Sequence, residues 1–357
     1  MTGRIRTGYL LAALAVAAAF LAAVLLTARQ DKGRMADEQL EAARIMAETE
    51  EYLKQLIQQE GILLQPEDLN GTFLIGPEVT ELTTTTGALE AKRTSLVPDM
   101  AAMMVRFYDE AGLGKGDTVA IGSSGSFPGL AIASIAAAQA MGLKIKVIAS
   151  LGASMYGATR VEFNIFDILL SMRGGGFADF ELTAVSQGST NDLGGGAWDG
   201  FLYEGTKEIF RRICTETAAD TEAVFIDGPD LAASIKARLE LFGEVDLFVN
   251  VGGAGACNGT TTRILDVPAG LVTSFDGIPE DETRGLVFEY LAEGIPVVNL
   301  LNVRQLAQDN GIPYDPVPMP QPGESDVYRE TRYSIWLIIA GLVSIAAILV
   351  IGRRKLL

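Results

Sequence analysis

The sequence predicts an α/β domain, with a doubly wound and mostly parallel sheet, between two transmembrane helices. Two observations predict this architecture. Strand-like apolar runs alternate with helix-like segments over most of the chain, and each end carries a long apolar stretch without charged residues. The chain has 357 residues, of which 48% are hydrophobic, so it can bury one large core or two smaller ones.

The first apolar stretch predicts a membrane anchor. Residues 9–28 carry no charge and follow a short basic terminus, residues 1–8. At about 1.5 Å per residue, a helix of this length crosses the ~30 Å hydrocarbon core of a bilayer. A signal peptide is the alternative, but the run exceeds a usual signal core, and Leu26-Thr27-Ala28 is a poor cleavage site.

The second apolar stretch, residues 333–352, ends in the basic tail 353–357, and two spans place both termini on one side of the membrane. Basic residues flank both spans on both sides, so their numbers on the two sides of the membrane are nearly equal and do not decide the orientation. Short basic termini are typical of the cytoplasmic side, and long loops cross regardless of charge. We therefore expect a two-pass protein of the cytoplasmic membrane with an extracytoplasmic domain.

Two segments connect the anchors to the α/β domain, which we place at residues 67–311. Residues 29–66 contain an amphipathic helix, Arg34 to Glu60, which is read as a stalk. A helical dimer contact and packing against its own domain are alternatives, and packing is favoured. Five prolines in residues 312–332 predict a stiff extended linker to the second span.

The domain is organised around Asp117 to Met141. A strand at Thr118–Ile121 ends at a glycine, a serine-rich turn follows, and Pro128 opens a helix that runs to Gly142. Lys144–Ser150 is the next strand, so the pair forms a right-handed parallel βαβ unit. The other expected strands are Thr72–Ile75, Phe180–Ser186, Ala223–Asp227, Asp246–Val251 and Pro296–Leu300, and the other expected helices are Pro98–Gly112, Val161–Met172, Phe201–Cys214, Pro229–Phe242 and Glu282–Glu293.

Glycine- and serine-rich loops follow three of these strands, and open parallel sheets bind ligands at the carboxyl edge. The N–H groups around Gly125 to Gly129 lack helical partners and suit an anion, although a satisfied αβ connection explains the turn equally well. Lys92 and Arg93 would add positive charge, unless they form a solvated pair with Glu90. The expected ligand-binding residues are Lys92, Arg93, Ser123, Ser124, Gly125, Ser126, Ser154, Gly253 and Gly255.

Composition excludes several function classes. The formal net charge is −17, and without five basic residues near the termini the region from Arg29 to Arg332 has 23 basic and 45 acidic residues, a net −22. Nucleic acid is therefore not an expected partner. The chain contains no histidine, which excludes Ser-His-Asp and Cys-His mechanisms. Its two cysteines, Cys214 and Cys257, permit one disulfide at most, and buried free thiols are favoured.

Few catalytic or cofactor sites remain. The glycines after Val251 do not form a phosphate loop, because the chain has no Gly-Lys-Ser/Thr and because no third glycine stands three residues after Gly255. No cofactor is expected, and no metal either, because the loop carboxylates Asp192, Asp199, Asp227 and Asp230 form no calcium loop. A hydrolytic alternative pairs Ser124 or Ser126 with Lys92 as its base.

Four segments carry a resemblance to a known family. They are Gly87-Ala-Leu-Glu-Ala-Lys-Arg-Thr-Ser95, Val119-Ala-Ile-Gly-Ser-Ser-Gly-Ser-Phe-Pro128, Ser150-Leu-Gly-Ala-Ser-Met-Tyr-Gly157 and Asn250-Val-Gly-Gly-Ala254. In this order they resemble the poly-γ-glutamate system protein family, which accompanies the capsule-type ligase and membrane subunits that make and export poly-γ-glutamate. The resemblance implies an accessory membrane protein in poly-γ-glutamate biosynthesis, export or anchoring, with the polymer or those subunits as partners. It supplies no catalytic residues. The first hypothesis is an accessory component that binds an anionic γ-glutamyl group or regulatory ligand. The alternatives are a serine-dependent amide hydrolase or transferase that trims or tethers the polymer, and a purely structural scaffold.

Overall fold

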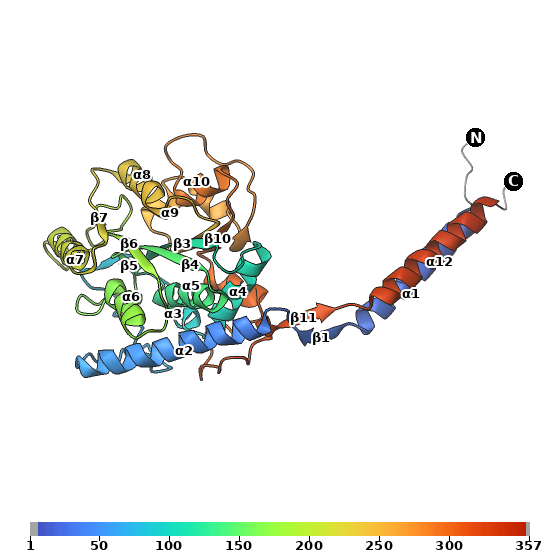
Figure 1. Cartoon of the computed structure of the whole chain (residues 1–357), viewed down its shortest axis with the longest axis horizontal. Coiled ribbons are helices and arrows are strands. Elements are labelled where there is room, and N and C mark those ends of the chain that lie inside the picture. The colour runs from blue at the N-terminus through green and yellow to red at the C-terminus, as the bar shows by residue number, and fades with distance from the viewer. Residues whose placement is uncertain (1–5, 355–357) are drawn as a thin grey trace. The chain divides into compact units, whose positions relative to one another are not determined.

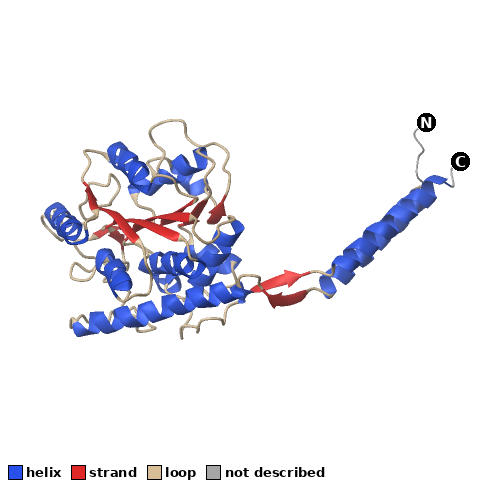
Figure 2. Cartoon of the chain, viewed as in Figure 1, coloured by secondary structure: helices blue, strands red, loops and turns tan. Residues whose placement is uncertain are grey.

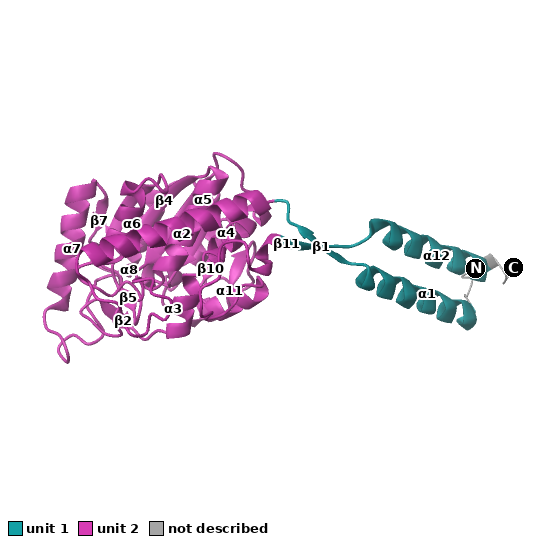
Figure 3. Ribbon diagram, turned by 90° about the horizontal axis from the view of Figure 1, so that it is seen from below, with its two compact units in different colours: residues 1–34, 329–357 teal, residues 35–328 magenta. Residues whose placement is uncertain are grey.

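A computed structural model describes residues 6–354. The chain divides into two compact units, which Figure 3 shows in different colours. The first contains Met1–Arg34 and Arg329–Leu357, and the second contains Met35–Tyr328. Each unit is described by itself below.

The first unit contains both apolar stretches as helices. Helices α1 (Thr7–Leu26) and α12 (Ile335–Arg354) pack closely, and a Cβ atom added at Gly341 would lie 3.0 Å from the side chain of Phe20. Both are long and apolar enough to cross a membrane, by length and composition alone. The charged strands β1 (Arg29–Lys32) and β11 (Arg329–Arg332) pair in an antiparallel ribbon that the sequence did not predict.

The second unit is built on a mostly parallel seven-stranded sheet, which confirms the α/β class (Figure 1). The strand order is β7-β6-β4-β3-β8-β10-β9, and only the short edge strand β9 runs antiparallel to its neighbour. From β3 the chain first adds β4, β6 and β7 on one side, then returns to add β8 and β10 on the other. The order therefore reverses between β3 and β8. The strands are β3 (Thr118–Ser124), β4 (Lys144–Ser150), β6 (Glu181–Ser186), β7 (Val224–Ile226), β8 (Leu247–Val251), β9 (Gly270–Val272) and β10 (Val297–Leu300).

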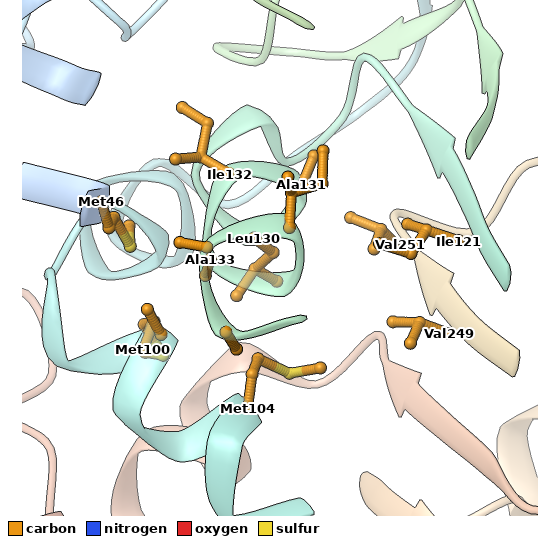
Figure 4. Close-up of a cluster of buried hydrophobic side chains, with 14 of the residues drawn as sticks. Met46, Met100, Met104, Ile121, Leu130, Ala131, Ile132, Ala133, Val249 and Val251 are labelled. Atoms are coloured by element: carbon orange, nitrogen blue, oxygen red, sulfur yellow. The ribbon is translucent and has the colours of Figure 1, made fainter. Parts of the chain in front are cut away.

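Helices cover both faces of this sheet (Figure 2). One face packs against α5 (Pro128–Met141), which is apolar on nearly all sides because the sheet covers one flank and α2 (Ala36–Gln59) and α4 (Asp99–Glu110) cover others. Figure 4 shows Met46 of α2 and Met100 and Met104 of α4 around this helix. The other face packs against α8 (Leu231–Phe242), α9 (Gly255–Asn258) and α10 (Leu286–Ala292).

The other described elements are α3 (Leu89–Ser95), α6 (Ile165–Gly174), α7 (Thr206–Thr221), α11 (Val303–Asp309), the 3-10 helices η1 (Thr262–Asp266) and η2 (Asp326–Tyr328), and the short parallel strands β2 (Thr83–Thr85) and β5 (Ala153–Ser154). Most expected elements are present with shifted ends. The expected strand at Thr72–Ile75 is absent: this segment is a loop, and the Asp68 carboxylate accepts hydrogen bonds from the main-chain N–H groups of Thr72 and Phe73.

Residues 35–66 of the expected stalk and residues 312–328 of the expected linker belong to the second unit, whereas residues 29–34 and 329–332 belong to the first. Helix α2 packs along α4 and α5, with Met46 and Leu53 fully buried. Residues 312–328 also pack on the unit, because the Asp99 carboxylate accepts hydrogen bonds from the N–H groups of Gly323 and Ser325, each at 3.0 Å, and from the hydroxyl of Tyr328. The compact unit therefore extends well beyond residues 67–311 at both ends.

Candidate functional site

The candidate site lies at the carboxyl ends of β3 and β8, where the strand order reverses. In open α/β sheets this switch point leaves a crevice between loops that diverge to opposite faces. Two cavities lie here, of about 920 Å³ and about 250 Å³, and both are lined by Ser126 and Gly252. The three glycine- and serine-rich loops therefore meet at one edge, as the sequence predicted.

The smaller cavity has walls of hydroxyl groups and glycines. It is lined by Ser124 at the end of β3 and Ser126 after it, and by Gly253 and Gly255 after β8. Further hydroxyl groups come from β2 and from the loop after β6, namely those of Thr84, Thr85, Ser189 and Thr190. Both serine hydroxyls accept a main-chain hydrogen bond. The N–H of Ser126 donates to Ser124 Oγ at 3.3 Å, and the N–H of Ser154 donates to Ser126 Oγ at 3.0 Å.

The larger cavity adds one cation, Arg304, and three side-chain amides, those of Asn299, Asn302 and Gln305. Ser126 and Ser154 line one part of it, and Asn299, Asn302 and Arg304 come from the end of β10 and the start of α11. The Arg304 guanidinium is exposed and lies over the ring of Tyr314, 4.3 Å from its centroid. Among the described residues that line this cavity, Arg304 is the single cation, while Glu90 and Asp266 are acidic.

Lys92 reaches the wall of the larger cavity from behind. It lies on α3, its exposed fraction is 2%, and its Nζ atom is 2.5 Å from Ser154 Oγ. The Nζ group also donates to the main-chain carbonyl of Ser126 and lies 3.7 Å from the centroid of the Phe127 ring. Burial lowers the pKa of Lys92 from 10.5 to about 7. Near neutral pH the side chain is therefore divided between the amine and the ammonium form.

Arg93 points away from the cavities. Its guanidinium binds the Asp315 carboxylate at two points, 2.6 Å from Nε to Oδ1 and 2.7 Å from Nη2 to Oδ2. This ion pair raises the pKa of Arg93. The expected cradle of two adjacent cations is therefore wrong, and so is the alternative of a solvated pair answered by Glu90, because both side chains are buried.

The turn after β3 offers fewer free N–H groups than predicted. The N–H of Gly125 donates to the carbonyls of Ser150 and Gly152, at 3.1 and 3.0 Å. Ser123 is buried, its hydroxyl donates to the carbonyl of Ser124, and it is not among the residues that line the two cavities. Gly125 and Ser123 thus stabilise the turn, which agrees with the structural alternative for this segment.

The glycines after β8 are explained by close packing. Gly253 has φ +73°, in the left-handed region, and a Cβ atom at Gly255 would lie 2.0 Å from the carbonyl oxygen of Thr190. Glycine at these positions lets the loop after β6 approach the loop after β8. Both glycines line the smaller cavity, so they shape it through their main chain.

The loop carboxylates have other partners. Asp192 is buried and accepts a hydrogen bond from Arg238 at 2.9 Å, Asp227 pairs with Arg211, and Asp230 caps α8. Within residues 6–354, no group of three or more acidic or cysteine residues could hold a metal ion. Cys214 and Cys257 are free and buried, and burial raises the pKa of the Cys257 thiol to about 11.

Several site residues were missed in the sequence. Arg304 and Asn302 follow the strand at Pro296–Leu300, and Ser189 and Thr190 follow the strand at Phe180–Ser186. The rule that parallel sheets bind at their carboxyl edge applied to these loops too.

Comparisons of this chain with protein-family models, with curated proteins and with solved structures find no match.

Proposed function

We propose that this chain is a membrane-anchored accessory component of a poly-γ-glutamate synthesis or export system, and that its larger cavity binds a γ-glutamyl group. The observation that carries the proposal is the composition of this cavity at the switch point: hydroxyls, amides and one cation. A γ-glutamyl unit presents one carboxylate and one amide. The Arg304 guanidinium suits the carboxylate, and Asn299, Asn302 and the serine hydroxyls suit the amide.

The charge of the chain limits how much polymer this site accepts. The formal net charge is −17, and Glu90 and Asp266 also line the cavity. A long polyanion is repelled by such a surface, whereas one carboxylate beside Arg304 is attracted locally. The proposal is therefore recognition of one or a few units, or of a chain end.

The two apolar helices support the membrane part of the proposal. If both span, the α/β unit lies on one side of the cytoplasmic membrane. We place it outside, where an exported polymer passes, with the synthesis and export subunits as partners. Protease treatment of intact cells tests this placement: a unit that resists digestion until the cells are lysed contradicts it.

Binding is tested by titrating the full-length chain in detergent with oligo-γ-glutamate at low salt. Arg304→Gln is expected to weaken binding by about 10- to 100-fold, because a hydrogen bond to a charged group is worth about 1.5–3 kcal/mol. Arg212→Gln is the matched control, since Arg212 is an exposed arginine on α7 that pairs with Glu216. Oligo-α-glutamate of equal length tests whether the γ-linkage matters. No binding at low salt, or equal loss in both variants, contradicts the proposal.

A further inference from the structure

Four serines of the described residues line the two cavities at the carboxyl edge: Ser124, Ser126, Ser154 and Ser189. Ser154 alone among them has its hydroxyl beside a lysine. The hydroxyls of Ser124 and Ser126 each accept a hydrogen bond from a main-chain N–H group. The hydroxyl of Ser154 instead lies 2.5 Å from the Nζ atom of Lys92. A serine hydroxyl in contact with a buried amine is the arrangement that activates serine in the absence of histidine.

We propose that Ser154 and Lys92 form a nucleophile and base pair that performs acyl transfer on an amide held in the larger cavity. The amide is the γ-glutamyl linkage, so the substrate class rests on the proposed function, while the pair itself does not. This assignment replaces Ser124 and Ser126 as candidate nucleophiles.

The surroundings of the pair hold both groups in place. Strand β5, which contains Ser154, pairs with β2, and the N–H of Ser154 donates to Ser126 Oγ. The Ser126 carbonyl and the Phe127 ring fix the Nζ group of Lys92. Ser126 is thus a positioning residue, because it holds both members of the pair through its hydroxyl and its carbonyl.

Access to the pair depends on Gly87, which lines the larger cavity together with Ser154. A Cβ atom added at Gly87 would lie 3.1 Å from Lys92 Cε, 3.2 Å from Ser154 Oγ and 2.7 Å from the carbonyl oxygen of Met155. Glycine here leaves space directly beside the reacting hydroxyl. The same glycine belongs to a segment whose neighbouring residues form α3, so one short stretch supplies both the base and the opening.

The protonation state of Lys92 fits the role of a base. Its described partners are a hydroxyl, a carbonyl and an aromatic ring, and burial is the cause of its lowered pKa, about 7. Glu90 and Arg93 on α3 are the nearest charged residues in sequence, and Asp315 already neutralises Arg93. Arg304 and Asp266 line the same cavity as Ser154. A general base works best when its pKa lies near the operating pH.

The reaction proceeds in two balanced steps. In the first, Lys92 Nζ accepts the hydroxyl proton while Ser154 Oγ forms a bond to the amide carbon, and the C–N bond then breaks as the resulting ammonium returns its proton to the leaving amine. In the second, water or an acceptor amine attacks the serine ester, Lys92 accepts its proton, and that proton returns to Ser154 Oγ. Water gives a shortened polymer, and an amine gives a transferred chain.

The pair is tested on the full-length chain in detergent with a fluorophosphonate probe, which labels activated serines without needing γ-glutamyl recognition. We expect intact-mass and peptide analysis to place the label on Ser154, at a rate that rises with pH through about 7. Lys92→Met is expected to slow labelling by at least about 100-fold, the usual contribution of a general base. Gly87→Ala is expected to slow it as well, and Ser171→Ala on α6 serves as a control with unchanged rate.

The inference would be overturned by the absence of label on Ser154, or by labelling of Ser154 at the wild-type rate in a folded Lys92→Met protein. The pH profile of the wild-type chain is informative even where a variant fails to fold, and a rate independent of pH between 5 and 9 also overturns it. Competition by oligo-γ-glutamate tests the substrate class separately. Labelling that the oligomer does not slow leaves the pair intact and rejects the γ-glutamyl linkage as its substrate.

Discussion

Replacing Lys92 by methionine is expected to change the stability of the folded protein by an amount that depends on pH, with a gain that grows as the pH falls from 9 to 6. Burial lowers the pKa of Lys92 from 10.5 to about 7, whereas in the unfolded chain this lysine is exposed to water. Between about pH 7 and pH 10.5 the unfolded state therefore binds more protons than the folded state. The free energy of unfolding of the wild-type protein therefore decreases as the pH falls from 10.5 to about 7, and the decrease is complete below about 7.

The size of the effect follows from these two pKa values. At ~1.4 kcal/mol per pH unit, the protonation penalty on the wild-type protein is about 2 kcal/mol at pH 9 and about 5 kcal/mol at pH 6. Methionine has no such penalty but loses two hydrogen bonds, worth about 1 kcal/mol each at any pH. The difference in unfolding free energy between variant and wild type should therefore grow by about 3 kcal/mol from pH 9 to pH 6.

Denaturant unfolding of the full-length chain in detergent, followed by circular dichroism between pH 6 and 9, measures this difference. Lys144→Met is the control, because Lys144 is exposed at the start of β4 and its removal should give a difference that changes little with pH. A Lys92→Met effect that is constant across this range would refute the reasoning, since it would mean that Lys92 remains charged in the folded state.

Two further substitutions test buried charges elsewhere in the α/β unit. Arg238→Met should lower the free energy of unfolding by about 3–5 kcal/mol, because it leaves Asp192 buried without its cation. Adding Asp192→Asn to this variant should recover much of that loss. A double variant whose loss equals the sum of the two single losses would contradict this reasoning. Glu50→Gln should stabilise the protein at pH 7–8 and progressively less towards pH 5 in the same unfolding assay. Burial and the Asp68 charge raise the pKa of Glu50 well above 4.5, the pKa expected in the unfolded chain. Glu50 therefore does not destabilise the fold below pH 4.5, and it lowers the free energy of unfolding progressively as the pH rises above 4.5. A Glu50→Gln effect on the free energy of unfolding that does not change with pH would contradict a raised pKa for this carboxyl group.

The central elements of the fold were predictable because their signals are local. The strand at Lys144–Ser150 has the expected ends, and the helix opened by Pro128 begins where it was expected, because an apolar run between breakers determines both. The ribbon of β1 and β11 was not predictable. Its strands consist of the charged and polar residues Arg-Gln-Asp-Lys and Arg-Glu-Thr-Arg, and they pair across nearly the whole chain.

The site was predictable as a location but not as a set of contacts. Loops after parallel strands must share an edge, so the meeting of the Ser126, Ser154 and Gly253 loops followed from the order of strands and helices. The roles of Lys92 and Arg93 did not follow, because α3 is helical and adjacent residues on a helix point about 100° apart. One side chain therefore reaches the cavity wall while the other reaches Asp315, a partner 222 residues away in sequence.

Four cations of the described chain are almost completely buried, and comparing them separates structural from functional charge. Arg93 and Arg238 each pair with a carboxylate, which offsets the cost of removing their charge from water. Arg160 donates to the carbonyls of Phe73 and Ile75, and a guanidinium keeps its proton in such surroundings.

Among these four cations, Lys92 is the one whose pKa burial lowers to about 7, so that it is partly deprotonated near neutral pH. Its Nζ atom contacts the hydroxyl of Ser154, which lines the larger cavity. A methionine of similar length would fill the same space at lower cost in stability. Groups that lower the stability of a protein are found chiefly at its functional sites, because changes that favour activity often reduce stability. The position of Lys92 behind Ser154 therefore favours a chemical role for the carboxyl edge over one of packing alone.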